Sequence, residues 1–261
     1  MIALPVERLM LETLVEGARQ LGLVLTPAQL AAFQTYYEEL VAWNRRFNLT
    51  AITDYQAIQV RHFLDSLSCL LALRTVGRLS GRGQRTPSAA GDGLRVIDVG
   101  TGAGFPGLPL KIVCPEMRLT LLEATGKKTR FLEHIVARLG LRRVTVIHGR
   151  AEELGHVPGH REGYDWVLAR AVAEMPTLAE YLLPLCRVGG HCLAQKGEDA
   201  PAEVTRAERA ITLLGGEVNR LIPVELPGLA ETRYLVVVDK VATTPEKYPR
   251  RPGIPSKRPL S

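Results

Sequence analysis

The sequence predicts an α/β fold: a mainly parallel β-sheet covered by helices on both faces, preceded by a helical extension. After residue 94, short apolar stretches typical of strands alternate with amphipathic stretches typical of helices. The first 73 residues instead show helical spacing of their apolar residues. The last two predicted strands are separated by little more than a turn, which favours an antiparallel pair at the sheet edge.

The helical extension is predicted over residues 1–76 and contains three helices. Apolar residues recur at near-helical spacing over 9–21, and Gly22 is a plausible stop. The sequence Thr26-Pro27-Ala28-Gln29 predicts the second helix start, because it combines a capping threonine, a first-turn proline and a glutamine that can complete a capping box. A third helix is expected to begin near Thr53-Asp54 and to carry residues 61–67.

The α/β part is predicted over residues 94–241. Its predicted strands cover residues 94–99, 118–122, 143–147, 164–169, 191–195, 218–224 and 234–241. Its predicted helices cover residues 107–113, 127–139, 175–186 and 201–214. The segment 77–93 is rich in Gly, Ser, Pro and Arg, so we expect a flexible basic loop there, and residues 242–261 are expected to form a basic C-terminal tail.

Composition excludes several classes of protein. The chain has 261 residues, of which 46% are hydrophobic and 23% charged, as is ordinary for a globular protein. No apolar run approaches the roughly 20 residues that a membrane helix needs, and charges interrupt the first 22 residues, so neither membrane insertion nor secretion is expected. We therefore predict a cytoplasmic protein. The four cysteines lack paired spacing, and Pro158 and Gly159 separate His156 from His160, so no metal site is predicted.

The net charge of +6 is concentrated in two segments. Residues 240–261 hold six basic residues against one acid, and residues 74–95 hold five arginines against one acid. The remainder of the chain is mildly acidic. Such basic segments suit a polyanionic partner such as nucleic acid, although charge alone is equally compatible with a solubilising tail.

A glycine-rich loop follows the first strand of the sheet. Gly100, Gly102 and Gly104 lie between the predicted strand and a predicted helix, where glycines allow a sharp turn and close approach of a ligand to the backbone. Glu123 ends the next strand, where an acid can hold two ribose hydroxyls. This order predicts an adenosine-type ligand rather than merely a tight turn.

The loop is compatible with two cofactors. Its G-x-G-x-x-G spacing satisfies the dinucleotide pattern, so an NAD-type oxidoreductase is one hypothesis. Three features favour S-adenosylmethionine: Asp98 lies two residues before the first glycine, Pro106 removes an N–H that a diphosphate would use, and no second catalytic domain follows. Ala151 and Glu152, after the third strand, are placed to contact an adenine ring.

The sequence also resembles a known family, the RsmG (GidB) proteins, which are bacterial small-subunit rRNA guanine-N7 methyltransferases. The resemblance covers nearly the whole chain in order. It rests on residues 48–52, 61–67, 98–111, 126–128, 130–132, 149–153, 169–171, 196–197, 248–253 and Lys257.

The resemblance implies a Rossmann-like class I S-adenosylmethionine-dependent methyltransferase sheet with an N-terminal helical extension. It implies methyl transfer from S-adenosylmethionine to N7 of guanine 527 (rRNA numbering) in 16S rRNA. By position, the family's cofactor contacts fall on Gly100, Phe105, Glu123, Ala124, Thr125, Ala151, Glu152 and Arg170. Loop reasoning adds Asp98, Gly102 and Gly104. The segment 77–93 is longer than is usual in the family.

The chemistry requires no catalytic base, because guanine N7 carries a free lone pair and no proton. We therefore nominate no catalytic residue. The partner is expected to be 16S rRNA within the 30S subunit or its precursor, and the protein is expected to be a monomer. The basic residues expected to bind RNA are Arg61, Lys127, Lys128, Arg170, Lys196, Arg250, Arg251 and Lys257.

Three points stay open from the sequence. Arg61 either binds RNA or pairs with Asp65 one helical turn later. His62, Tyr36 and Trp43 are interpreted as packing residues rather than catalytic or base-stacking groups. A non-catalytic RNA-binding assembly factor that retains the cofactor is a third hypothesis.

Overall fold

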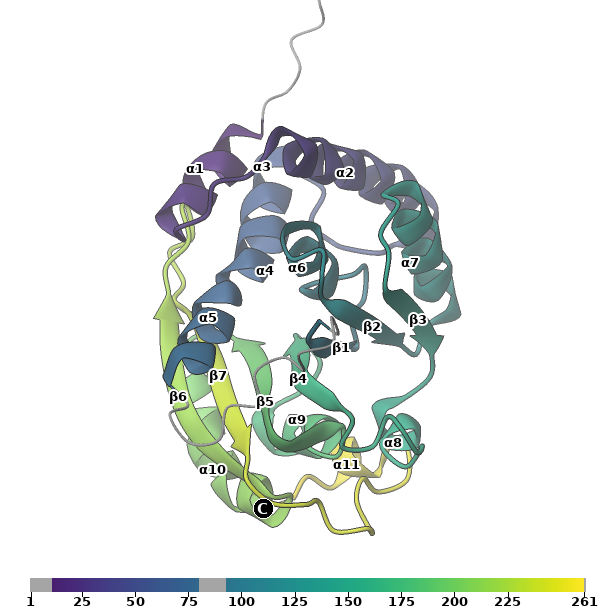
Figure 1. The fold of residues 1–261 in the computed structure, drawn as a ribbon, viewed down its shortest axis with the longest axis vertical. Coiled ribbons are helices and arrows are strands. Elements are labelled where there is room, and N and C mark those ends of the chain that lie inside the picture. The colour runs from purple at the N-terminus through teal and green to yellow at the C-terminus, as the bar shows by residue number, and fades with distance from the viewer. Residues whose placement is uncertain (1–10, 80–92, 261) are drawn as a thin grey trace, which may run out of the picture.

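A seven-stranded sheet forms the centre of the computed structural model, which describes residues 11–79 and 93–260 (Figure 1). The strands lie in the order β3-β2-β1-β4-β5-β7-β6. Their bounds are β1 Arg95–Val99, β2 Arg118–Glu123, β3 Val144–His148, β4 Tyr164–Arg170, β5 Cys186–Lys196, β6 Gly216–Val224 and β7 Arg233–Lys240. The first five strands pair in parallel, and β7 pairs antiparallel with both β5 and β6. The predicted antiparallel edge pair is confirmed.

Helices cover both faces of the sheet, as predicted. In the α/β part they are α6 Gly107–Val113, α7 Gly126–Arg138, α8 Ala151–Leu154, α9 Met175–Leu182 and α10 Ala200–Leu213. Successive side chains along a strand point to opposite faces of the sheet, and each face packs into an apolar core of its own. Trp166 and Leu168 of β4 join the core with α6, α7 and the N-terminal helices, whereas Val167 and Ala169 join the core with α8 to α10.

The N-terminal extension (residues 12–79) is helical as predicted. It comprises α1 Glu12–Gln20, α2 Pro27–Phe47, α3 Tyr55–Ile58, the π-helical turn η1 Gln59–Leu64, α4 Asp65–Ser68 and α5 Leu70–Leu79. Thr26 caps α2, and its capping box with Gln29 is present. The predicted third helix is interrupted by η1, and π-turns of this kind are frequent at functional sites.

Several predicted boundaries shift by one or two residues in the structure, and those of α9, β5 and α5 differ by more. Helix α9 ends at Leu182 rather than at residue 186, because Pro184 lacks the N–H that a helix requires, and β5 begins at Cys186. Helix α5 continues to Leu79, so it takes up the first three residues of the segment predicted as a loop. The rest of that predicted loop, residues 80–92, lies outside the described residues, as does the start of the predicted extension, residues 1–10.

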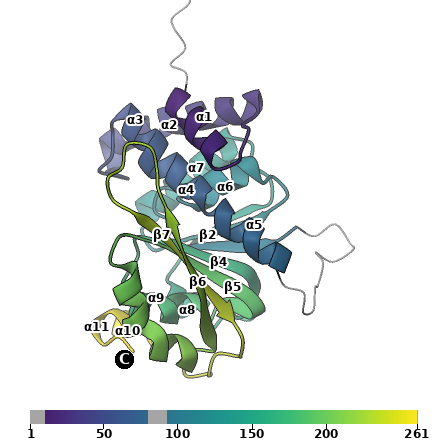
Figure 2. The same ribbon diagram turned by 90° about the vertical axis from the view of Figure 1, so that its left-hand side faces the viewer.

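The C-terminal segment (residues 241–260), predicted as a basic tail, packs against the rest of the protein. Tyr248 is buried, and α11 Ile254–Lys257 forms a helical turn. The guanidinium of Arg161 donates to the carbonyls of Thr244 and Tyr248 at 2.7 and 2.8 Å. Figure 2 shows this segment and the N-terminal helices on opposite sides of the sheet. The segment is therefore part of the folded body, and its first role is packing.

The described residues contain no helix long and apolar enough to cross a membrane. The four cysteines, Cys69, Cys114, Cys186 and Cys192, are free. Within the same residues, no group of three or more His, Cys, Asp or Glu side chains gathers in a way that would hold a metal ion.

Candidate cofactor and RNA site

The glycine loop lies between β1 and α6, beside the point where the strand order reverses from β1-β2 to β1-β4. Open α/β sheets bind ligands at this position, beyond the carboxyl ends of the strands. Gly102 has φ +63°, and a Cβ added there would meet nothing within 4 Å, so its backbone faces open space. At Gly104, φ is +102° and a Cβ would lie 2.5 Å from the Tyr36 hydroxyl. Only glycine fits there.

Glu123 joins the glycine loop to the end of β2. Its Oε2 accepts a hydrogen bond of 2.9 Å from the Gly102 N–H, and its Oε1 accepts one of 2.8 Å from the Thr125 N–H. The side chain is buried, while Ala124 beside it is exposed. The structure thus brings together the loop and the acid that the sequence pairs. It also adds a role that sequence reasoning missed: the carboxylate orders the backbone around it.

Asp98, in β1, contacts the same loop through its carboxylate. Its Oδ2 accepts from the Thr101 hydroxyl at 2.5 Å and from the Gly107 N–H at 2.8 Å. Its Oδ1 is buried and has no hydrogen-bond partner among the described residues. Burial raises the pKa of Asp98 to about 7, although the hydrogen bonds from Thr101 and Gly107 act in the opposite direction. Asp98 therefore holds the loop in place at Thr101 and at Gly107.

The N-terminal extension holds the other side of the loop. The Tyr36 hydroxyl donates to the Ala103 carbonyl at 2.5 Å. The Phe105 ring stacks on both Tyr36, at a centroid distance of 5.2 Å, and His62, at 4.4 Å. Phe105 is 4% exposed and packs between the extension and the loop, and its contact with the cofactor stays a prediction. Burial lowers the pKa of His62 to about 3, with a contribution from the nearby Arg170 charge, so the ring is neutral at pH 7.

Arg170 ends β4 and connects it to the extension. Its Nη1 donates to the Arg61 carbonyl and to Asp65 Oδ2, both at 2.9 Å, and its guanidinium lies 5.0 Å from the centroid of Phe105. Only 16% of the side chain is exposed. The alternative pairing of Arg61 with Asp65 is wrong, because Asp65 pairs with Arg170. Sequence reasoning missed this pair, since 105 residues separate its members.

Ala151 and Glu152 lie in α8, where the C-terminal segment covers them. Glu152 Oε1 accepts from the Gly253 N–H at 3.0 Å, and both α8 residues are buried. The side chain of Arg250 in this segment donates three hydrogen bonds to the carboxylate of Glu180, which is fully buried. Both contacts connect the C-terminal segment to the elements beside the predicted adenine site.

Comparison with known proteins identifies the family. A family model described as GidB, rRNA small subunit methyltransferase G, matches residues 29–227. The chain belongs to this family. The family's "Ribosomal RNA small subunit methyltransferase G" of Roseiflexus castenholzii is 54% identical, over 96% of this chain and 100% of that protein. The same-named protein of Pelotomaculum thermopropionicum is 48% identical, over 95% and 98%.

Membership in the GidB family confirms the predicted resemblance and the predicted enzyme class, an rRNA methyltransferase that uses S-adenosylmethionine. Among solved structures, that of a mutant of MtNAS superposes with a TM-score of 0.52 at 16% identity, over 87% of this chain and 78% of that one. This likeness concerns the fold, and it extends beyond the sheet into the helical extension. The NAD-type oxidoreductase and the non-catalytic assembly factor lose their support.

The expected RNA-binding residues divide into two groups. Lys127, Arg251 and Lys257 are exposed, and Arg61 and Lys128 are half-buried. In contrast, Lys196 Nζ lies 2.5 Å from Glu203 Oε2 with 10% of the side chain exposed, and Arg250 is held by Glu180. Together with Arg170, these two cations already have internal partners, so the structure favours packing roles for them.

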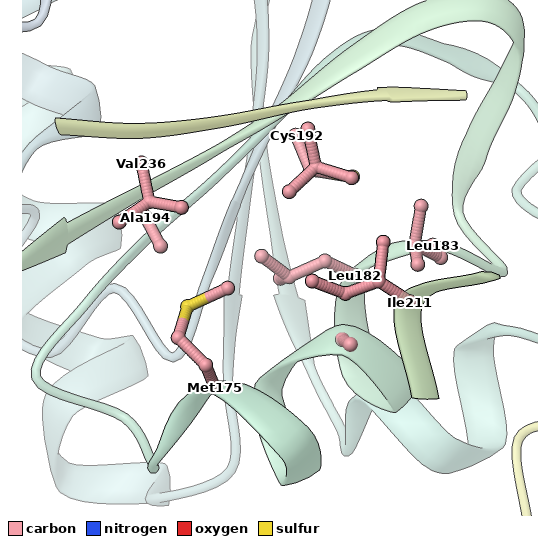
Figure 3. Close-up of a pocket in the computed structure, with 9 residues that line it drawn as sticks. Met175, Leu182, Leu183, Cys192, Ala194, Ile211 and Val236 are labelled. Atoms are coloured by element: carbon pink, nitrogen blue, oxygen red, sulfur yellow. The ribbon is translucent and has the colours of Figure 1, made fainter. Parts of the chain in front are cut away.

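A small cavity lies away from this site, between α9, α10, β5 and β7 (Figure 3). Its volume is about 10 Å³, and its lining is apolar. It is lined by Met175, Ala179, Leu182, Leu183, Cys192, Ala194, Ile211, Val236 and Val238. A space of this size holds at most one water, which would find no polar partner. The cavity is a packing defect and binds no cofactor.

Proposed function

We propose that this rRNA methyltransferase transfers a methyl group from S-adenosylmethionine to N7 of guanine 527 (rRNA numbering) in 16S rRNA. Membership in the GidB family supports the reaction class. One structural observation carries the proposal. The Gly102 backbone faces open space and is hydrogen-bonded to the Glu123 carboxylate, at the point where the strand order of the sheet reverses.

The residues around the glycine loop fit S-adenosylmethionine. Glu123, Ala124 and Thr125 would receive the ribose side, and Ala151 with Glu152 the adenine side. The backbone from Gly100 to Gly104 would lie along the methionine part, with Asp98 ordering it from below. When bound, this cofactor supplies an electrophilic methyl group on a sulfonium. Phe105 and Arg170 shape the site from the side of the N-terminal extension.

The chain's contribution to catalysis is positioning. Guanine N7 attacks with a lone pair and releases no proton, so a general base has no proton to accept. The neutral His62 is consistent with this, because it is buried against Phe105 rather than free to exchange a proton with a substrate. Holding two reactants in line lowers the free-energy barrier of a reaction by up to about 7–11 kcal/mol. In A-form RNA, N7 faces the deep major groove, so the target guanine should lie in an irregular region.

The RNA is proposed to enter as part of the 30S subunit or its precursor and to meet a monomeric enzyme. Arg61, Lys127 and Lys128 flank the loop side of the site, and Arg251 and Lys257 lie on the C-terminal segment. The three internally paired cations, Arg170, Lys196 and Arg250, would act on RNA only through the residues they hold in place.

The test is methylation of 30S subunits from a strain that lacks the protein, followed by mass mapping of the modified nucleotide. One 7-methylguanine at position 527 is the expected result. Methyl transfer to another base or position would reject the assignment, and NADH binding without S-adenosylhomocysteine binding would reject the cofactor.

A further inference from the structure

Helices α2 and α7 pack against each other (Figure 1), and their side-chain contacts show that they run antiparallel. The ring of Trp43, near the end of α2, lies 5.6 Å from that of Phe131, near the start of α7. Glu39, one turn earlier in α2, lies 2.7 Å from His134 and 3.2 Å from Arg138, further along α7. The C-terminal end of α2 therefore meets the N-terminal end of α7.

Both helix ends carry basic residues and no acids. Residues 43–50 contain Arg45 and Arg46, and residues 126–132 contain Lys127, Lys128 and Arg130. Four of these five side chains are exposed, and Lys128 is half-buried. Within the described part of the chain none of the five has an ion-pair partner, although Arg46 lies 5.8 Å from the ring centroid of Phe47. We call these five residues the helix-end patch.

Helix stability explains only two of these five residues, Arg45 and Arg46. Cations at the C-terminal end of α2 interact favourably with the helix dipole. The three at the start of α7 do not, and α7 has no acidic residue in its first turn. Placing the two ends together adds repulsion between like charges. A cost of this kind is explained by a polyanion that binds across both ends.

The helix-end patch also borders the cofactor site. Helix α7 begins at Gly126, directly after the Thr125 whose N–H donates to Glu123. A substrate whose base reaches the methyl group must therefore pass its neighbouring phosphates close to this edge of the protein. Arginine and lysine side chains at such an edge bind phosphate oxygens without reading sequence.

We propose that Arg45, Arg46, Lys127, Lys128 and Arg130 form one surface that binds backbone phosphates of rRNA next to the target nucleotide. The inference rests on the proposed function, since it takes rRNA as the substrate. It adds the end of α2, which belongs to the N-terminal extension, to the RNA-binding surface. The extension then contributes to substrate binding as well as to the support of the glycine loop.

Two double variants test the surface, Arg45→Gln/Arg46→Gln and Lys127→Gln/Lys128→Gln. The matched control is Arg206→Gln/Arg209→Gln, which removes two exposed charges from α10 on the other side of the sheet (Figure 1). Binding of 16S rRNA is measured over a range of salt concentrations, together with steady-state kinetics on 30S subunits. Melting temperature and S-adenosylhomocysteine affinity verify that the fold and the cofactor site are intact.

The logarithm of the RNA-binding constant falls with the logarithm of the salt concentration, by about 0.7–0.9 for each phosphate contact. Each patch variant should therefore make this salt dependence shallower by up to about 1.5. KM for RNA should rise while kcat stays unchanged, because the lost contacts act equally on bound substrate and transition state. The control should match the wild type.

An α2 variant that behaves like the control overturns the proposal. So does a variant that binds naked 16S rRNA normally but loses activity on 30S subunits, because the patch would then contact a protein. Failure of the proposed function looks different: the wild type would bind rRNA with the full slope yet produce no 7-methylguanine.

Discussion

The two ends of the chain support the cofactor site in different ways. The N-terminal extension contacts the glycine loop itself, through the Tyr36 hydroxyl and the stacked ring of Phe105. Among the described residues, the C-terminal segment makes no hydrogen bond to the loop, and instead binds α8 and α9 through Gly253 and Arg250. One end thus shapes the part of the backbone that faces the ligand, and the other stabilises the helices behind it.

This difference separates two properties that a variant can change. Loss of an N-terminal contact should alter cofactor affinity, because the loop conformation depends on it. Loss of a C-terminal contact should lower the free energy of unfolding first, because its ion pair is buried. The following predictions test that separation, beginning with the largest expected effect.

Arg250→Ala should lower the free energy of unfolding by about 3–5 kcal/mol, because it leaves the fully buried Glu180 carboxylate without its cation. Denaturant unfolding measures the loss. The control is Arg251→Ala, which removes the neighbouring exposed cation and should change stability little. Equal effects from the two variants would show that the Glu180 pair does not anchor the C-terminal segment.

Glu123→Ala should weaken S-adenosylhomocysteine binding at least tenfold, which corresponds to about 1.4 kcal/mol or more. It removes the acceptor shared by the Gly102 and Thr125 N–H groups as well as the proposed ribose contact. Calorimetric titration measures the affinity. Glu153→Ala, a matched change at an exposed residue of α8, is the control. Unchanged affinity in Glu123→Ala would remove this residue from the cofactor site.

Tyr36→Phe should lower stability by about 1–3 kcal/mol, because the buried Ala103 carbonyl loses its donor while the ring stays in place. It should also weaken S-adenosylhomocysteine binding, unlike Arg250→Ala measured under conditions where that variant is folded. Tyr37→Phe is the matched control. If Tyr36→Phe altered stability alone, the extension would support the fold and not the loop conformation.

The last effect is the smallest near neutral pH, because it appears only as the pH falls below 6.5. The pKa of His62 is about 3 in the folded protein and near 6.5 in the unfolded chain, because burial opposes its charge. Its contribution to stability is complete above pH 6.5 and is lost as the pH falls toward 3, by at most about 1.4 kcal/mol per pH unit. His62→Gln should reduce the fall in the free energy of unfolding between pH 6.5 and pH 3, which denaturant unfolding at a series of pH values measures.

Much of the fold was predictable because its signals are local. Capping at Thr26, the helix from Gly107 to Val113 and the succession of strands along the chain depend on neighbouring residues, and the structure agrees. The helix boundary near Pro184 was missed although its signal was present, since proline cannot continue a helix. The π-helical turn at Gln59–Leu64 has no comparable local signal.

The candidate site was predictable where residues lie close in sequence or follow a strand. The glycine loop and Glu123 belong to that class, and their mutual hydrogen bond follows from the parallel pairing of β1 and β2. Charges were not predictable in this way. In the sequence, nothing distinguishes the basic residues Arg170, Lys196 and Arg250 from Arg251 and Lys257. In the structure, the first three pair with an acidic side chain, whereas the last two are exposed and have no ion-pair partner among the described residues.

The sequence by itself therefore determined the order of elements, the glycine loop and the family. The tertiary structure decided which cations are available to RNA and which support the site. The physical reason is that a charge brought into the interior requires a partner, and the partner is supplied by whichever distant segment packs there. Asp65 lies 105 positions from Arg170, and Glu180 lies 70 from Arg250, so only folding reveals either pair.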